Sequence, residues 1–124
     1  MHALAARPDL LARTERTTAA AVAAELGSPA PPVVLDVRTR SEWQSKRIAG
    51  SVNVPLNQLQ ARTAELPRNR RIVVHCAGGY RSSIAISMLQ CHGVELLAEL
   101  AGGMAAWQAA KLPVSNRTVA SALV

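Results

Sequence analysis

The chain has 124 residues, a net charge of +6 and a composition that is 49% hydrophobic and 18% charged. This length suits one domain and leaves little room for a second core, and the apolar share excludes a chain that is too polar to fold. The positive field attracts anions, but no aromatic side chains alternate with the basic residues, so we expect a small anionic partner and no nucleic acid.

The first third of the chain is predicted to contain a helix and a buried strand. Residues 1–16 show no firm period and are interpreted as a leader or tail. The stretch from Thr17 or Thr18 to Gly27 has a capping residue, strong helix formers and a terminal glycine, which together predict a helix. Val33–Val37 is short, rich in β-branched residues and preceded by proline, so it is predicted to be a buried strand.

Short elements are expected in the middle of the chain. Ser41 is the candidate N-cap of a helix that ends near Lys46. Gly50 then turns the chain into a brief extended piece at Ser51–Val54, which a proline closes. Asn57–Leu66 is a further candidate helix, so this region is expected to connect two main strands.

Strands and helices alternate in the second half of the chain. In order, we predict a strand, a helix, a strand and a helix at Arg71–Cys76, Ser82–Cys91, Val94–Leu100 and Met104–Lys111. Such alternation predicts an α/β fold whose mainly parallel sheet is covered by helices on both faces. The domain is expected at residues 17–113, followed by a C-terminal tail at residues 114–124.

The two cysteines and the distribution of charges limit the cellular setting. Cys76 and Cys91 do not form a CxxC pair, so we expect neither a disulfide framework nor a metal site. We also expect no cofactor and a reducing, cytoplasmic location. Charged residues within the first sixteen positions leave no apolar region for a signal peptide. The most apolar long stretch, Ile84–Trp107, is interrupted by polar residues, so no membrane partner is predicted.

The segment His75–Ser82 carries the candidate chemistry, because it lies where a predicted strand ends and a predicted helix begins. Open α/β sheets place their ligand sites at such junctions. Gly78 and Gly79 allow successive N–H groups to turn inward around an anion, and the following helix adds the positive end of its dipole. These donors, together with Arg81, favour the thiolate of Cys76 and make it a candidate nucleophile.

A lone cysteine at a strand end is more often a small buried apolar residue than a catalytic one. Here two glycines and an arginine follow Cys76 within five positions, and a helix begins directly after them. Packing alone does not explain this combination. The catalytic interpretation of Cys76 is therefore favoured.

Between Val33 and Pro113 the sequence resembles the rhodanese family in three separate stretches. Residues 36–55 contain DVRTRSEW and IAGSVNVP, similar to the family's Asp-Val-Arg segment and its Ile-x-Gly-Ala-x-Asn-Ile-Pro pattern. Residues 76–82, CAGGYRS, resemble the family's catalytic loop. Residues 102–107, GGMAAW, resemble its closing Gly-Gly-x-x-x-Trp element. The order and spacing of the three stretches make the resemblance specific.

The resemblance implies a rhodanese-like α/β domain with a five-stranded, mostly parallel sheet and an active-site loop after the fourth strand. It also implies a sulfurtransferase in which Cys76 takes sulfur from thiosulfate or a small persulfide and passes it to cyanide or another thiol. Arg81 lies at the loop position that meets the anion in active members. The N–H groups expected to bind the sulfur anion are those of Ala77, Gly78, Gly79, Tyr80 and Arg81.

Two details of the resemblance concern individual segments. Lys46 and Arg47 stand before Ile48, where many relatives have Gly-His, and we expect little effect of this departure on the loop. The string CAGGYRS is similar to that of rhodanese domains that are fused to, or work beside, metallo-β-lactamase-type persulfide dioxygenases. A persulfide-metabolising enzyme is therefore a candidate partner.

The length of the Cys76 loop distinguishes sulfur transfer from other functions of similar loops. Cysteine-based phosphatases and arsenate reductases place five residues between the cysteine and the arginine, whereas four separate Cys76 from Arg81. This narrower loop disfavours a tetrahedral phosphate. Some rhodanese-like domains lack the nucleophile and serve in docking, and Cys76 argues against that role. A sulfur carrier that serves one partner protein stays open.

The remaining polar and aromatic residues near the motifs are given supporting roles. Asp36, Arg38 and Ser82 are expected to support the loop, because a strand-end Asp near an Arg more often fixes a loop than acts as acid or base. His75 is a proton shuttle or a core histidine, and Cys91 a resolving thiol or, by preference, a core residue. Tyr80 lines the pocket rim or faces solvent. Packing roles are expected for Trp43, Met104 and Trp107.

Overall fold

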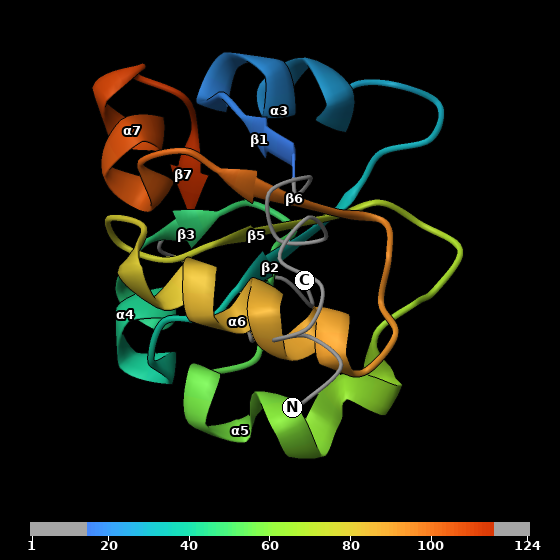
Figure 1. The fold of residues 1–124 in the computed structure, drawn as a ribbon. Helices are drawn as coiled ribbons and strands as arrows, with labels where there is room; N and C mark the ends of the chain where they lie inside the picture. Colours follow the sequence, from blue (N-terminus) through green and yellow to red (C-terminus); the bar gives the residue numbers. More distant parts are fainter. Residues whose placement is uncertain (1–14, 116–124) are drawn as a thin grey trace, which may run out of the picture.

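The computed structural model describes residues 15–115 and has an α/β architecture built on one parallel sheet (Figure 1). The five strands lie in the order β1-β6-β5-β2-β4, and all neighbouring pairs are parallel. The fourth of these strands in the chain, β5, lies in the centre. The predicted fold class is confirmed. The strands are β1 (Glu15–Thr17), β2 (Val33–Asp36), β4 (Val52–Asn53), β5 (Ile72–His75) and β6 (Leu97–Leu100).

Helices cover both faces of the sheet, with α3 and α7 on one side and α5 and α6 on the other (Figure 1). A short antiparallel pair formed by β3 (Arg47–Ile48) and β7 (Val114–Ser115) lies apart from the main sheet. The remaining elements are α3 (Ala19–Leu26), α4 (Arg40–Ser45), α5 (Leu56–Arg62), the 3₁₀ helix η1 (Thr63–Glu65), α6 (Tyr80–Cys91) and α7 (Gly103–Ala109).

The two faces of the central strands supply two aliphatic cores. Leu35 and Val74 belong to the core beneath α5 and α6, whereas Val34 and Val73 belong to the core beneath α3 and α7. Successive residues of a strand point to opposite faces, so a sheet that is covered on both sides needs continuous apolar runs. The sequence VVL in β2 and IVV in β5 meets this requirement.

Strand β1 begins at Glu15, two residues before the domain boundary expected at residue 17. Its residues pair in register with β6, Glu15 opposite Ala98 and Thr17 opposite Leu100. The side chain of Arg71 holds Glu15 through an ion pair. This short edge strand consists of two charged residues and a threonine and is stabilised by backbone pairing. Its sequence therefore has no hydrophobic pattern from which a strand could be predicted.

The N-cap of α4 is Thr39, and the prediction that Ser41 caps this helix is wrong. The Thr39 side chain accepts a hydrogen bond from the N–H of Glu42, and the Glu42 carboxylate accepts one from the N–H of Thr39. This reciprocal capping box satisfies two N–H groups that would otherwise have no partner at the start of the helix. Ser41 does not make this pair of hydrogen bonds. It also fixes the Glu42 carboxylate at the start of α4.

Helix α6 begins at Tyr80, two residues earlier than predicted, which shortens the loop after β5. Tyr80 and Arg81 therefore belong to the first turn of the helix. The strand before it ends at His75, as the sequence pattern indicated to within one residue. None of the helices between residues 15 and 115 combines the length and the apolar character of a membrane span.

Candidate active site

Strand β5 and helix α6 place Cys76 at the centre of the carboxyl edge of the sheet. Cys76 follows the last residue of β5 directly, and Gly79 is the N-cap of α6. Gly79 has a φ of 124°, a conformation that residues with a side chain rarely adopt. The chain can therefore turn from strand to helix within the four residues 76–79, and Cys76 is 1% exposed beneath this turn.

Two backbone donors converge on the sulfur atom of Cys76. The N–H of Gly79 lies 3.1 Å from Sγ and the N–H of Ser82 lies 3.3 Å from it. Helix α6 has no side-chain cap of the usual kind. The sulfur thus takes the place of the N-cap acceptor and meets the positive end of the helix dipole. Of these two donors, Gly79 was among the predicted N–H groups and Ser82 was not.

The hydrogen bonds at Sγ decide the ionisation of the thiol. Burial alone raises the pKa of Cys76, but donors from Ser82, Gly79 and Gly78 outweigh burial and lower the pKa below its ordinary value. The N–H of Ser82 makes the largest contribution to this lowering. The thiolate is the nucleophilic form of cysteine, so the loop raises the share of reactive Cys76 near neutral pH.

The glycine pair at the start of α7 lets this helix pack on the backbone of the loop. The N–H of Met104 donates to the carbonyl of Cys76 at 2.8 Å, and the N–H of Ala105 donates to the carbonyl of Ala77 at 3.1 Å. A Cβ on Gly103 would lie 2.2 Å from the Cys76 carbonyl oxygen. Helix α7 therefore holds the loop carbonyls in a fixed direction, and the loop can direct its N–H groups toward the sulfur.

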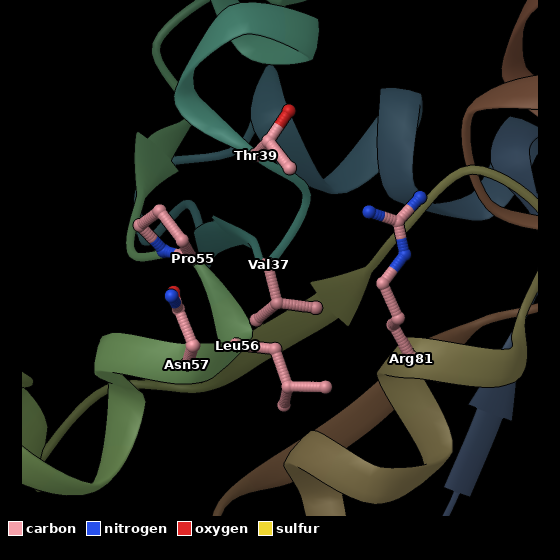
Figure 2. A pocket seen from close by; sticks show the side chains of 6 residues that line it. All are labelled: Val37, Thr39, Pro55, Leu56, Asn57 and Arg81. Atoms are coloured by element: carbon pink, nitrogen blue, oxygen red, sulfur yellow. The ribbon is translucent and has the colours of Figure 1, made fainter.

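Arg81 faces a carboxylate on another element. Its guanidinium donates to both carboxylate oxygens of Glu42, at 2.8 and 3.1 Å. The pair lowers the pKa of Glu42 to about 2, chiefly through the hydrogen bond from Arg81. Arg81 also lines a pocket of about 310 Å³ beside the loop (Figure 2). The other lining residues are Val37, Thr39, Pro55, Leu56 and Asn57.

A buried ion pair fixes the neighbouring loop after β2. Asp36 is fully buried and accepts three hydrogen bonds from the Arg38 guanidinium, at 3.0, 3.1 and 2.7 Å. Arg38 continues to the carbonyl of Lys46 at 2.6 Å. The side-chain amide of Asn53 donates to the carbonyls of Asp36 and Arg38. These contacts give the Asp36–Arg38 pair the geometry of a loop support.

His75 lies in the core beside this ion pair. Its side chain is fully buried, Nδ1 lies 3.2 Å from the carbonyl oxygen of Cys76, and Nε2 lies 3.6 Å from Oδ2 of Asp36. Burial lowers the pKa of His75 although Asp36 acts in the opposite direction. The ring is therefore neutral at pH 7, which fits a core histidine better than a proton shuttle.

A model of the rhodanese-like domain family matches residues 18–110, which include β2, the Cys76 loop and α7. The chain belongs to the rhodanese-like domain family. The family resemblance expected from the three sequence stretches is thus confirmed.

Relatives of this rhodanese-like domain include proteins named for sulfur transfer. A sulfurtransferase from Allochromatium vinosum is 30% identical over 82 residues, which cover 66% of this chain and 77% of that protein. The crystal structure of the Alr3790 protein from Anabaena sp. has a TM-score of 0.77 and 34% identity, and the match covers 86% and 87% of the two chains.

A crystal structure of thiosulfate sulfurtransferase from Pseudomonas aeruginosa is also similar. It has a TM-score of 0.77 and 33% identity over 85% of this chain, but the match spans 21% of that larger chain. These relatives support a role in sulfur transfer for the domain.

Sequence reasoning missed two carboxylates of this rhodanese-like domain. Glu42 pairs with Arg81 across 39 positions, and Glu99 accepts a hydrogen bond of 2.6 Å from the Ser82 hydroxyl across 17 positions. Glu99 could have been found from the sequence, because a charged residue within the buried strand β6 is unusual. The capping-box spacing of Thr39 and Glu42 was likewise visible, but nothing local points to Arg81.

The other residues considered from sequence have ordinary environments. Tyr80 is 81% exposed at the start of α6 and therefore faces solvent. Cys91 is half-buried, and both cysteines are free. Trp107 is buried and donates to the carbonyl of Pro113 at 2.8 Å. Within the described residues no cluster of three His, Cys, Asp or Glu side chains is placed to hold a metal ion.

Proposed function

We propose that the domain is a sulfurtransferase in which Cys76 carries one sulfur atom as a persulfide. The observation that carries this proposal is the pair of N–H groups, from Gly79 and Ser82, that lie 3.1 and 3.3 Å from Sγ. They stabilise the thiolate, and the same donors suit the terminal sulfur of a persulfide, which is also an anion. Relatives named sulfurtransferases support the same role.

In the first step, the Cys76 thiolate attacks the outer sulfur of a donor such as thiosulfate. A bond forms between Sγ and that sulfur while the sulfur–sulfur bond of the donor breaks, and sulfite leaves with the electron pair. A small persulfide donor reacts in the same way and leaves as its thiolate. The remaining N–H groups of the first turn, on Tyr80 and Arg81, have no partner within the helix and are available to the donor anion.

In the second step, cyanide or a thiolate attacks the outer sulfur of the persulfide. The sulfur–sulfur bond breaks, its electron pair returns to Sγ, and the Cys76 thiolate is restored. Cyanide then leaves as thiocyanate. All atoms and electrons come from the two substrates, so the proposed cycle needs no cofactor.

The Arg81–Glu42 pair favours a second candidate, a sulfur carrier that serves one partner protein. A free anion must compete with the Glu42 carboxylate, which holds the guanidinium at 2.8 and 3.1 Å. A partner that contacts Glu42 would release Arg81 for the donor. In this case transfer from free thiosulfate is slow and transfer from the partner, a persulfide-metabolising enzyme among the candidates, is fast.

Thiocyanate release from thiosulfate and cyanide tests the proposal. We expect turnover by the wild type and by Cys91→Ser, and none by Cys76→Ser. Slow turnover that rises in Glu42→Gln supports the partner-dependent carrier, whereas turnover that is fast only with an organic persulfide supports a sulfurtransferase whose donor is a persulfide. If neither donor class yields a product that requires Cys76, the sulfurtransferase proposal is wrong. The cytoplasmic location stays a prediction.

A further inference from the structure

Glu99 is a buried carboxylate on the same face of the sheet as Cys76. In β6 it lies between Ala98 and Leu100, and in register it is opposite Val74, two residues before Cys76. Leu97 and Val74 belong to the core beneath α6. Because side chains alternate along a strand, the Glu99 side chain points toward the start of α6.

The contacts of Glu99 lead directly to the active-site loop. Its Oε2 lies 2.6 Å from the Ser82 hydroxyl and 3.2 Å from the Ser83 hydroxyl. Its Oε1 lies 3.6 Å from Nε of Arg16, whose side chain is 66% exposed. A buried carboxylate needs close donors, and a long contact to an exposed arginine compensates it weakly. The Ser82 hydroxyl is therefore the closest donor to this carboxylate.

The Ser82 hydroxyl has one hydrogen and several acceptors nearby. Glu99 Oε2 lies at 2.6 Å and the carbonyl of Gly79 at 3.0 Å, and the Cys76 sulfur is also within reach of the hydroxyl. Hydrogen bonds to charged acceptors are shorter and stronger than those to neutral ones, so the hydrogen points to Glu99. The Ser83 hydroxyl, 3.1 Å from the Gly79 carbonyl, then satisfies that oxygen.

We propose that Glu99 is a positioning residue that holds the hydroxyl hydrogen of Ser82, so that backbone N–H groups are the donors to the Cys76 sulfur. The inference rests on the proposed role of Cys76 as the nucleophile. A thiolate loses nucleophilicity as its pKa falls. By keeping one donor away from the sulfur, Glu99 preserves the reactivity of the thiolate toward the sulfur donor.

The test is a pH titration of the Cys76 thiolate, followed by its ultraviolet absorbance, in the full chain. Cys91→Ser is present throughout, so that one thiol titrates. Glu99→Leu removes the acceptor and frees the Ser82 hydrogen for the sulfur, and Ser82→Ala removes the hydroxyl. Both variants, and the double variant, keep the other titratable and charged groups around the loop. These are Arg16 on β1, the Asp36–Arg38 pair after β2, Glu42 on α4, His75 on β5 and Arg81 on α6.

We expect Glu99→Leu to move the midpoint of the thiolate titration to lower pH, and Ser82→Ala alone to leave it nearly unchanged. In the double variant, the shift caused by Glu99→Leu should be at most half as large as in the single variant. A shift of similar size in both backgrounds means a simple charge effect and overturns the inference. A higher midpoint in Ser82→Ala alone also overturns it, because the hydroxyl then donates to the sulfur already. This last comparison holds even if Glu99→Leu does not fold.

Alkylation by iodoacetamide gives a second readout that a purely structural role would not produce. One pH unit below the wild-type midpoint, Glu99→Leu should react about twofold faster, because its larger thiolate fraction outweighs its lower nucleophilicity, and well above both midpoints about threefold slower. A change in one direction at every pH contradicts the inference. Neither readout involves sulfur transfer, so failure here is distinct from failure of Cys76 to form a persulfide.

Discussion

Two ion pairs flank the Cys76 loop, and they differ in burial and in the elements they join. The inner pair, Asp36–Arg38, is buried and closes a local loop, with side chains 0% and 7% exposed. The outer pair, Glu42–Arg81, joins α4 to α6 and leaves 37% and 30% of its side chains exposed. The inner pair is suited to fixing geometry, whereas the outer pair can exchange one anion for another.

The largest effect is expected at the inner pair. Arg38→Met leaves the buried Asp36 carboxylate without its partner and should cost about 3–5 kcal/mol of unfolding free energy. Arg62→Met, which breaks the exposed pair with Glu65, is the matched control and should change the free energy of unfolding far less. Urea unfolding measures both. Equal losses in the two variants would remove the distinction between buried and exposed pairs.

The packing of α7 on the loop gives the next largest effect. Gly103 has a φ of 55°, and the Cβ added by Gly103→Ala would lie 2.2 Å from the Cys76 carbonyl oxygen. We therefore expect this variant to lose about 3 kcal/mol of unfolding free energy. Gly78→Ala is the control, since its Cβ meets nothing within 4 Å and its φ is not in the left-handed range. A stable Gly103→Ala domain would show that α7 does not hold the loop.

At the outer pair the expected effect is on substrate binding. Arg81→Met should raise the KM for thiosulfate about tenfold, the value of one charge-assisted hydrogen bond, with a smaller change in kcat. Alkylation of Cys76 by neutral iodoacetamide is the control reaction and should change less than about twofold. An unchanged KM would mean that Arg81 serves Glu42 and not the donor anion.

The smallest effect is the pH dependence of the outer pair. The pKa of Glu42 is about 2 in the folded chain, below the unfolded value of 4.5, so its contribution is present above pH 4.5 and is lost as pH falls toward 2. Because the pair is partly exposed, the contribution should not exceed about 1 kcal/mol. Thermal unfolding of wild type and Glu42→Gln should therefore differ at pH 6 and converge at acid pH. A constant difference would contradict the assignment.

Local patterns made the central strands, the place of Cys76 at a strand end and the turn after it predictable from the sequence. The apolar runs of β2 and β5 required burial on both faces, and Gly79 supplied the one turn that lets Cys76 face a helix start. Asp36 and Arg38 are two positions apart, so their pairing was also within reach of local reasoning. Each of these features depends on neighbours in the chain.

The features that could not be predicted depend on residues distant in the chain. Arg81 meets Glu42 because α4 and α6 lie at the same edge of the sheet, and Ser82 meets Glu99 because β6 lies beside β5. No local pattern distinguishes an arginine that contacts an anion from one that contacts a carboxylate. The strand at Glu15–Thr17 was missed because its stabilisation comes from backbone pairing.

The central claim, that Cys76 carries sulfur, is tested most directly by the intact mass of the reduced protein before and after addition of a donor. Thiosulfate or an organic persulfide should add one sulfur atom to the wild type and to Cys91→Ser, on the peptide that contains Cys76, and cyanide should remove it. Cys76→Ser should gain nothing. An unchanged wild-type mass with both donors, or sulfur found on Cys91 instead, would contradict the account.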